Sequence, residues 1–489
     1  MQKIKDQVFR LVPKGTFARH VATLMSGTVL AGTIAAIVVP ILTRIYTPQD
    51  FGIFALYSSL LGLLSAVVCG RYELAIILPE NDRDAANLLL LSIVISLCVC
   101  VLILLLVSFF RVLFAQLLGT SELAVWLWLL PLSLFASGLF KTLNFWSTRR
   151  NHFKRLAARQ IAQSGITAVA QIGAGTLCAS ASASGLIGGS IVGQLAAVGK
   201  LAWQIESDEG KFIRQSLDLS RFRRVAKRYK QFPLFDIWSG LLNTASTMLP
   251  TLLLGYFFNP AIVGFYALGY QVLSVPVGIV GTSIAQVFFP RANDAKRTGT
   301  IDKITLEIFK RLLGIGFAPI LLLTIIAPDL FALIFGSRWF SAGEYLRWMS
   351  VWLLFVFISS PLSNIYSIME KQREGLVVNF VMFCSRLIVL VIGGIRKDAV
   401  FTIAAFGVTG AILWIFNCIY IQHLAGISVI NTLITIVKEF FYGIPYALFP
   451  ILVYFATHNS FMFVVAGVGA GAIFLIVQAY RMWKTGQFA

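Results

Sequence analysis

The sequence predicts an all-α polytopic membrane protein with about fourteen transmembrane helices. They are expected to form two six-helix lobes, related by a parallel pseudo-repeat, plus two C-terminal helices. Hydrophobic residues make up 58% of the chain and charged residues only 12%, whereas soluble proteins carry about 25% charged residues. The apolar residues fall into long runs, and one short stretch returns 212 positions later in a similar setting.

Fourteen apolar runs approach the length of a span, because a bilayer core about 30 Å thick requires roughly 20 apolar residues per helix. The fifth and sixth runs are rich in Gly, Ala and Ser, so twelve spans is the alternative count. No alternating pattern of barrel strands dominates, which favours helices. The runs cover residues 18–43, 51–78, 86–110, 123–147, 160–179, 185–203, 233–257, 264–289, 309–327, 344–368, 376–394, 399–421, 440–456 and 461–480.

The repeat pairs residues 47–56, TPQDFGIFAL, with residues 259–268, NPAIVGFYAL. Four of the ten positions are identical, and each copy is a short turn that leads into an apolar run. An offset of six spans gives both halves the same orientation, as in transporters built from parallel repeats. The predicted parts are an N-terminal lobe (1–203), a cytoplasmic amphipathic linker (204–232), a C-terminal lobe (233–421) and an appendage of two spans (422–489).

The net charge of +19 is distributed as in a membrane protein. With fourteen spans, thirty Lys and Arg residues fall on the face that holds both termini, and six fall on the other face. The positive-inside rule therefore predicts that both termini are cytoplasmic. Basic loops also favour anionic lipid headgroups, so the lipid bilayer is the expected partner and nucleic acid is not.

The sequence contains no Walker-type phosphate loop, no zinc-protease motif and no nucleophile-elbow motif. The six cysteines fall within predicted spans and lack metal-ligand spacing, so neither a metal nor a cofactor is predicted. The loops opposite the termini are short, which argues against a membrane polymerase with an external catalytic domain. These features predict a transporter, not an enzyme.

The chain then resembles a known family. Residues 249–295, which include YFFNPAIVGFYALGYQVLSVPVGIVG, are similar to the seventh and eighth spans of bacterial oligosaccharide-lipid flippases. Residues 46–85 resemble their second span, and residues 368–376 resemble the loop after their tenth. These Wzx-like O-antigen and polysaccharide flippases belong to the multidrug/oligosaccharidyl-lipid/polysaccharide exporter superfamily.

The resemblance implies a V-shaped bundle of two six-helix lobes in the bacterial inner membrane. It implies a cargo, an undecaprenyl-pyrophosphate-linked oligosaccharide, that alternating access moves from the cytoplasmic to the periplasmic leaflet. The product would serve O-antigen, capsule or exopolysaccharide assembly, with a polysaccharide polymerase or chain-length regulator as a further partner. A multidrug/cation antiporter of the same superfamily is the alternative function.

Charged side chains within spans are the candidates for transport, because they are costly if they face lipid. Arg386 lies at the middle of its run, and a guanidinium can hold a pyrophosphate in a bidentate manner. The alternative is a bond from Arg386 to backbone carbonyls. Arg71 and Lys141 are further substrate-binding candidates. Their alternatives are a structural pair with an acid on another helix for Arg71 and snorkelling for Lys141.

Glu73 and Asp236 are acids found within or just inside the predicted spans. A buried carboxylate could bind and release H+ or Na+, so both are candidates for ion coupling. The alternatives are a structural partner for Glu73 and a hydrated or capping residue for Asp236. Seven tryptophans near span ends, Trp352 among them, are interpreted mainly as an interfacial belt.

Overall fold

The computed structural model describes residues 16–177 and 182–484, and within these ranges the secondary structure is helical without strands. The outermost residues of the termini, 1–15 and 485–489, lie outside the described residues. The chain separates into two compact units, residues 1–263 and residues 264–489. The predicted lobe boundary lies earlier, within 204–232, so the seventh apolar run groups with the first unit by its contacts.

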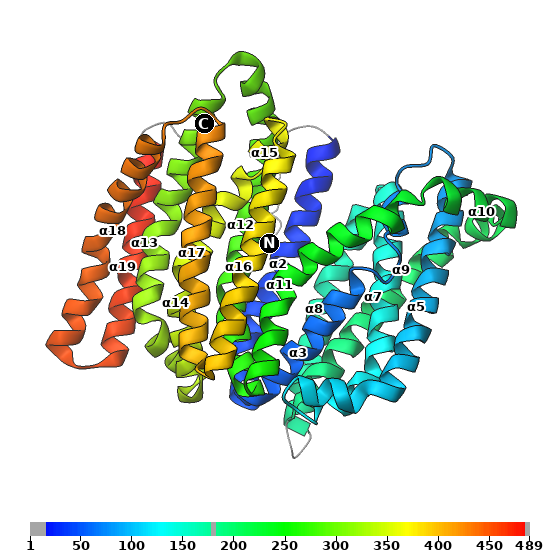
Figure 1. Ribbon diagram of the computed structural model, residues 1–489, viewed down its shortest axis with the longest axis horizontal. Helices are drawn as coiled ribbons and strands as arrows, with labels where there is room; N and C mark the ends of the chain where they lie inside the picture. The colour runs from blue at the N-terminus through cyan, green and yellow to red at the C-terminus, as the bar shows by residue number, and fades with distance from the viewer. Residues whose placement is uncertain (1–15, 178–181, 485–489) are drawn as a thin grey trace, which may run out of the picture. The chain divides into compact units, whose positions relative to one another are not determined.

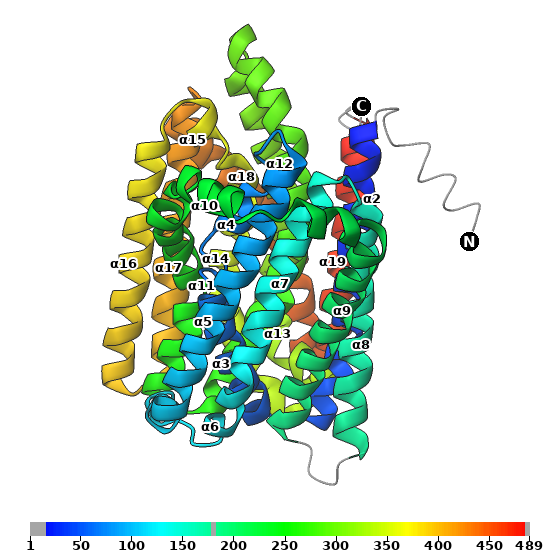
Figure 2. The same ribbon diagram turned by 90° about the vertical axis from the view of Figure 1, so that its right-hand side faces the viewer.

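Among its described residues, the first unit contains ten complete α-helices of 4 to 36 residues, joined by turns. Its order is α2 (Thr16–Ile45), α3 (Pro48–Ser65), α4 (Tyr72–Ala75), α5 (Asp82–Leu117), α6 (Leu123–Trp126), a 3-10 turn (Leu127–Leu129), α7 (Leu130–Arg149), α8 (Phe153–Leu177), α9 (Ala183–Ser216), α10 (Leu219–Arg228), a π-helical turn (Phe232–Asp236) and α11 (Ile237–Phe257). In Figure 2, α5, α7, α9 and α8 stand side by side, and each packs on the next.

The second unit begins within α12 (Pro260–Thr298), at Gly264. The residues of α12 before Gly264 belong to the first unit. Its order continues with α13 (Ile301–Phe335), a 3-10 turn (Ser337–Trp339), α14 (Phe340–Leu362), α15 (Ile365–Ile368), α16 (Gln372–Arg396), α17 (Ala399–Leu424), α18 (Val429–Thr457) and α19 (Ser460–Lys484). Figure 1 shows α16 beside α17 and α18 beside α19, and both pairs are in contact.

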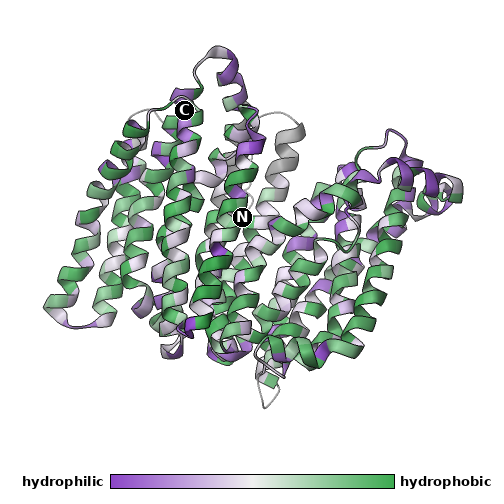
Figure 3. Cartoon of the chain, viewed as in Figure 1, coloured by the Kyte–Doolittle hydropathy of each residue, from purple (hydrophilic) through white to green (hydrophobic). Residues whose placement is uncertain are grey.

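Ten helical segments among the described residues are long and apolar enough to cross a membrane. The helices α3, α8, α11 and α12 are not among them. For α3 the length is marginal, at 18 residues, and α8 is rich in Ala, Gly and Gln. Figure 3 shows apolar residues along the helices and hydrophilic residues gathered at turns and on α10. The class of multi-pass helical membrane protein is confirmed, and the count of fourteen stays a prediction.

The sequence repeat marks two helix starts of the same kind. Thr47 accepts a hydrogen bond from the Asp50 amide at its hydroxyl, and its own amide donates to the Asp50 carboxylate, which forms a capping box. Asn259 likewise accepts from the Ile262 amide, at 3.1 Å. In both copies Pro occupies the first helical position, where its missing N–H costs nothing. The local repeat therefore encodes a helix start, while a two-lobe repeat stays a prediction.

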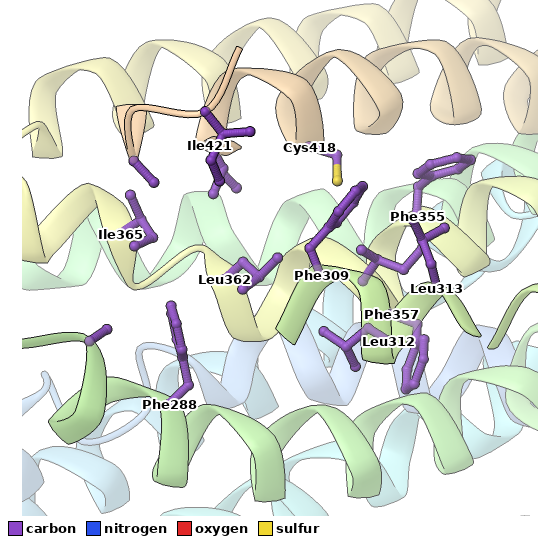
Figure 4. Close-up of a cluster of buried hydrophobic side chains, with 14 of the residues drawn as sticks. Phe288, Phe309, Leu312, Leu313, Phe355, Phe357, Leu362, Ile365, Cys418 and Ile421 are labelled. Atoms are coloured by element: carbon purple, nitrogen blue, oxygen red, sulfur yellow. The ribbon is translucent and has the colours of Figure 1, made fainter. Parts of the chain in front are cut away.

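The core of the second unit lies where α13, α14 and α17 meet (Figure 4). Phe309 and Leu313 of α13 pack there with Leu362 of α14 and with Cys418 and Ile421 of α17, and all five are fully buried. These apolar side chains fix the spacing of the three helices and leave α16 to pack on α17 from one side. The cluster thereby supports the helix that carries Arg386.

Within this unit, Arg347 supplies a hydrogen-bond donor that the neighbouring helix α13 lacks. Pro328 lies inside α13 and has no N–H to donate to the carbonyl of Thr324 four residues earlier. The Nε of Arg347 on α14 donates to that carbonyl at 3.1 Å, and its Nη2 donates to the carbonyl of Ile325 at 3.1 Å. A guanidinium thus replaces the backbone donor that the proline removes.

Candidate functional site

The second predicted span is interrupted, and the interruption carries two candidate residues. Residues 51–78 were expected to be one helix, but α3 ends at Ser65 and the chain turns before α4 begins at Tyr72. Gly70 and Arg71 both have positive φ, at 60° and 63°, which ends the right-handed helix. The expectation of a continuous span was therefore wrong. The turn places Arg71 at the start of α4 and Glu73 in its first turn.

Arg71 forms an ion pair with Asp236, which ends the π-helical turn before α11. Its Nε lies 3.2 Å from the Asp236 Oδ2. The guanidinium also lies against Gly240, where an added Cβ would be 2.6 Å from the Arg71 Nε. Gly240 therefore leaves the space that the guanidinium occupies. Arg71 thus has a pair with an acid on another segment, and its substrate-binding role stays a prediction.

Lys141, on α7, binds the end of α3. Its Nζ donates to the carbonyl of Ser65, and the Ser65 hydroxyl is 3.5 Å away. The carbonyls at a helix C-terminus have no intrahelical partner, so a lysine is a suitable donor there. Lys141 therefore points into the protein, which differs from the snorkelling alternative.

Four of the five predicted site residues come together in this first unit. Glu73 is buried, with 2% of its surface exposed, and it interacts electrostatically with Lys141, Arg71 and Asp236. Its Oε2 has no hydrogen-bond partner in the described part of the chain. Two cations thus face two carboxylates, and the cluster is balanced in charge when all four side chains are ionised.

Arg386 belongs to the second unit and has different surroundings. It lies ten residues before the end of α16 at Arg396, a depth of roughly 15 Å at 1.5 Å per residue. Its guanidinium carbon lies 5.2 Å from the centre of the Trp352 ring on α14, a cation–π contact. It also interacts electrostatically with Tyr266 and Tyr270 on α12. The side chain is therefore directed at neighbouring helices of its own unit.

An aromatic stack lies beneath this guanidinium. The rings of Tyr266 and Tyr270 are stacked with centres 6.0 Å apart, and Tyr270 is stacked on Trp352 at the same separation. Phe406 of α17 meets the edge of Trp352 at 5.1 Å. Trp352 is 5% exposed, and its Nε1 has no partner among the described residues. Trp352 lies in the middle of α14, so it is one of the tryptophans that an interfacial belt does not explain.

Arg386 has no carboxylate within ion-pair distance in the ranges 16–177 and 182–484, unlike Arg71. Its positive charge is therefore uncompensated by any protein acid described. An aromatic face contributes attraction but no negative charge, so the guanidinium keeps its capacity to bind an anion.

The aromatic partners of Arg386 were not identified from the sequence. Tyr266 and Tyr270 are four residues apart, which places them on one helix face. Trp352 lies away from both ends of its apolar run, 344–368. These spacings were the available signals, but the sequence does not indicate that α12, α14 and α16 meet at this depth.

Comparison with known proteins places the chain in a family. The profile of the family described as "Polysaccharide biosynthesis protein" matches residues 41–344, more than half of the sequence. The chain belongs to this family. The polysaccharide flippase assignment made from the resemblance is confirmed at this level.

Among related sequences, the lipopolysaccharide biosynthesis protein WzxC of Escherichia coli (strain K12) is 28% identical over 174 residues. The match covers 34% of this chain and 35% of WzxC, so the chain spans about a third of the length of that relative. A match of this extent supports common ancestry and does not identify the substrate of this chain.

Two solved structures share the fold. The lipid II flippase MurJ, in an inward closed conformation, has a TM-score of 0.72 at 12% identity, over 95% of this chain and 99% of MurJ. An inward-facing multidrug resistance transporter of the MATE family has a TM-score of 0.62 at 15% identity, over 83% of this chain and 96% of that chain. At these identities the likeness shows the fold alone.

Proposed function

We propose that this protein is a flippase that moves undecaprenyl-pyrophosphate-linked oligosaccharides from the cytoplasmic to the periplasmic leaflet. The observation that carries the proposal is the uncompensated guanidinium of Arg386, held on an aromatic stack within a membrane-embedded unit. Membership of the polysaccharide biosynthesis family supports a saccharide cargo. Transport would proceed by alternating access for O-antigen, capsule or exopolysaccharide assembly.

Arg386 would bind the pyrophosphate, because a planar guanidinium can donate two parallel hydrogen bonds to phosphate oxygens. The ring of Trp352 would restrict the guanidinium to one orientation and reduce the entropy lost on binding. Arg71 and Lys141 are proposed as weaker contributors, since each already has a partner in the protein.

Glu73 and Asp236 are proposed as the ion-coupling residues, for H+ or Na+. Neutralising either carboxylate would leave the cluster with an excess positive charge, because both cations would remain. A cation that binds here would therefore weaken the electrostatic attraction between the start of α4 and the segment that leads into α11. No cofactor is required for this scheme.

The proposed topology has fourteen spans, two six-helix lobes and two additional C-terminal helices. Both termini would lie in the cytoplasm, and the membrane would be the bacterial inner membrane. The excess of basic residues on one face supports this orientation. A polysaccharide polymerase or chain-length regulator is the proposed protein partner.

A multidrug/cation antiporter is the second candidate, since the fold fits it as well. A site for cationic drugs requires an available acid, but Glu73 and Asp236 face two cations. Arg386 would repel a cationic drug. The antiporter therefore predicts that the expressed protein lowers accumulation of cationic dyes, and the flippase predicts no change.

The decisive variant is Arg386→Ala, tested in a strain whose surface polysaccharide depends on this protein. We expect surface polysaccharide to be lost while the protein level in the membrane stays normal. Arg386→Lys should restore part of the export, because the charge remains but the bidentate geometry does not. Arg396→Ala, at the end of the same helix, is the matched control and should export normally. Normal export by Arg386→Ala would rule out the proposed pyrophosphate contact.

A further inference from the structure

The short helix α10 presents an unusual surface. Apart from Leu219 at its start, its apolar side chains face the protein: Val225 is 1% exposed, and Phe222, Ala226 and Tyr229 pack against the same buried cluster. That cluster draws on α4, α5, α7, α8 and α9, with Leu88, Leu201 and Ile205 among its members. The sequence had suggested an amphipathic linker at the membrane surface, but the apolar side of α10 packs on protein.

Polar contacts also hold α10 in place. Arg221 forms an ion pair with Asp84, and the Tyr72 hydroxyl donates to the carbonyl of Ala226 at 3.0 Å. Asp218 accepts from the Ser220 amide and so caps the first turn. Hydrogen bonds from the Ser220 hydroxyl and amide hold the pKa of Asp218 below its usual value, so the cap is charged at neutral pH. The orientation of α10 on its unit is thus fixed.

The opposite side of α10 is basic, and its cations lack ion-pair partners among the described residues. Arg223, Arg224, Lys227 and Arg228 are all exposed. At 100° per residue they fall on one face, directly opposite Phe222 and the other apolar residues. None of these four cations has an ion-pair partner among the residues that the structure describes, whereas Arg149, Arg150, Arg155 and Arg221 on neighbouring segments all do.

This basic face is followed by an exposed apolar segment. The chain continues from α10 into the π-helical turn and the first residues of α11, where Leu234, Phe235 and Trp238 are exposed large apolar residues. The sequence predicts that residues 233–257 span the membrane, and tryptophan is favoured at the level of the headgroups. A few residues separate this anchor from the four cations. The cations therefore lie near the headgroup region.

We propose that the basic face of α10 (Arg223, Arg224, Lys227 and Arg228) is a docking surface for anionic phospholipid headgroups of the adjacent leaflet. Anionic lipids attract basic residues close to the membrane surface, and this attraction weakens as salt is added. Because α10 is fixed to α4 and α5, bound lipids would hold that end of the first unit at the membrane surface. The inference does not depend on the cargo proposed above.

The test uses full-length protein in neutral detergent micelles and measures binding of a fluorescent phosphatidylglycerol against a fluorescent phosphatidylcholine. We expect the wild type to prefer phosphatidylglycerol, and 0.5 M salt to reduce the preference. The variant R223Q/R224Q/K227Q should lose about tenfold or more in affinity for phosphatidylglycerol. The variant R223K/R224K keeps the charge and should bind as the wild type does.

The matched control, R297Q/K303Q/K310Q, removes the same charge from exposed positions of α12 and α13. This control should retain most of the wild-type affinity for phosphatidylglycerol. An equal loss in this control would overturn the proposal, because binding would then follow net charge. Undecaprenyl diphosphate is measured in parallel. If R223Q/R224Q/K227Q loses affinity for it but not for phosphatidylglycerol, the surface serves the cargo and the proposal fails.

Discussion

A methyl group added at Gly240 tests the local arrangement of the Arg71–Asp236 pair. The added Cβ would lie 2.6 Å from the Arg71 Nε, so the guanidinium must move away from Asp236. At 3.2 Å, the attraction between the two charges is about 5 kcal/mol for an effective dielectric constant near 20 and about 1 kcal/mol in water. Because the Asp236 side chain is 41% exposed, we expect a net loss of about 1 kcal/mol.

The same substitution also favours the helix. Alanine in place of glycine stabilises a helix by about 1 kcal/mol. Gly240→Ala should therefore leave the free energy of unfolding nearly unchanged in the wild type. In an Asp236→Asn background the ion pair is already absent, so Gly240→Ala should stabilise the protein by about 1 kcal/mol. The coupling between the two substitutions is then about 1 kcal/mol.

Unfolding in mixed micelles with increasing SDS, followed by tryptophan fluorescence, measures both free energies. Gly165→Ala is the matched control, because nothing lies within 4 Å of a Cβ added on that part of α8. It should stabilise both backgrounds equally. If Gly240→Ala also stabilises both backgrounds equally, the guanidinium does not occupy the space at Gly240, and the reasoning is refuted.

Three further outcomes are expected. Arg347→Ala should destabilise the protein by about 1–3 kcal/mol, because the carbonyl of Thr324 loses its donor, and Arg347→Lys should recover part of this in the same unfolding assay. Trp352→Leu should raise the cargo concentration for half-maximal transport about tenfold by releasing Arg386, and Trp352→Phe should raise it less; equal transport by both would contradict the positioning role. Thr47→Ala should cost about 1 kcal/mol of stability and Thr47→Ser almost nothing, as measured by SDS unfolding.

Much of the helical framework follows from the composition, because long apolar runs have few alternatives in a membrane protein. The repeat likewise predicted where two helices begin, since Thr47 and Asn259 are capping residues followed by proline. The break after α3 was missed: its residues are apolar enough to continue a span, and the positive φ of Arg71 is not encoded by hydropathy.

The candidate site was predicted in part. An ionisable residue deep in an apolar run is costly in free energy if it faces lipid. This cost identified Arg386 and Glu73 as candidates. The partners of such a residue depend on which helix faces meet, and one sequence does not specify these. Asp236 and Gly240 therefore gained their relation to Arg71 only from the structure, as did the ring of Trp352 beneath Arg386.

Transport in proteoliposomes tests the central claim most directly. Purified protein is reconstituted with a fluorescent undecaprenyl-pyrophosphate-linked oligosaccharide, and cargo reaching the opposite leaflet is detected by an impermeant quencher. The wild type and Arg396→Ala should move the cargo, whereas Arg386→Ala should not, and added inorganic pyrophosphate should compete only when Arg386 is present. Equal movement by Arg386→Ala and the wild type would contradict the claim that this guanidinium binds the cargo.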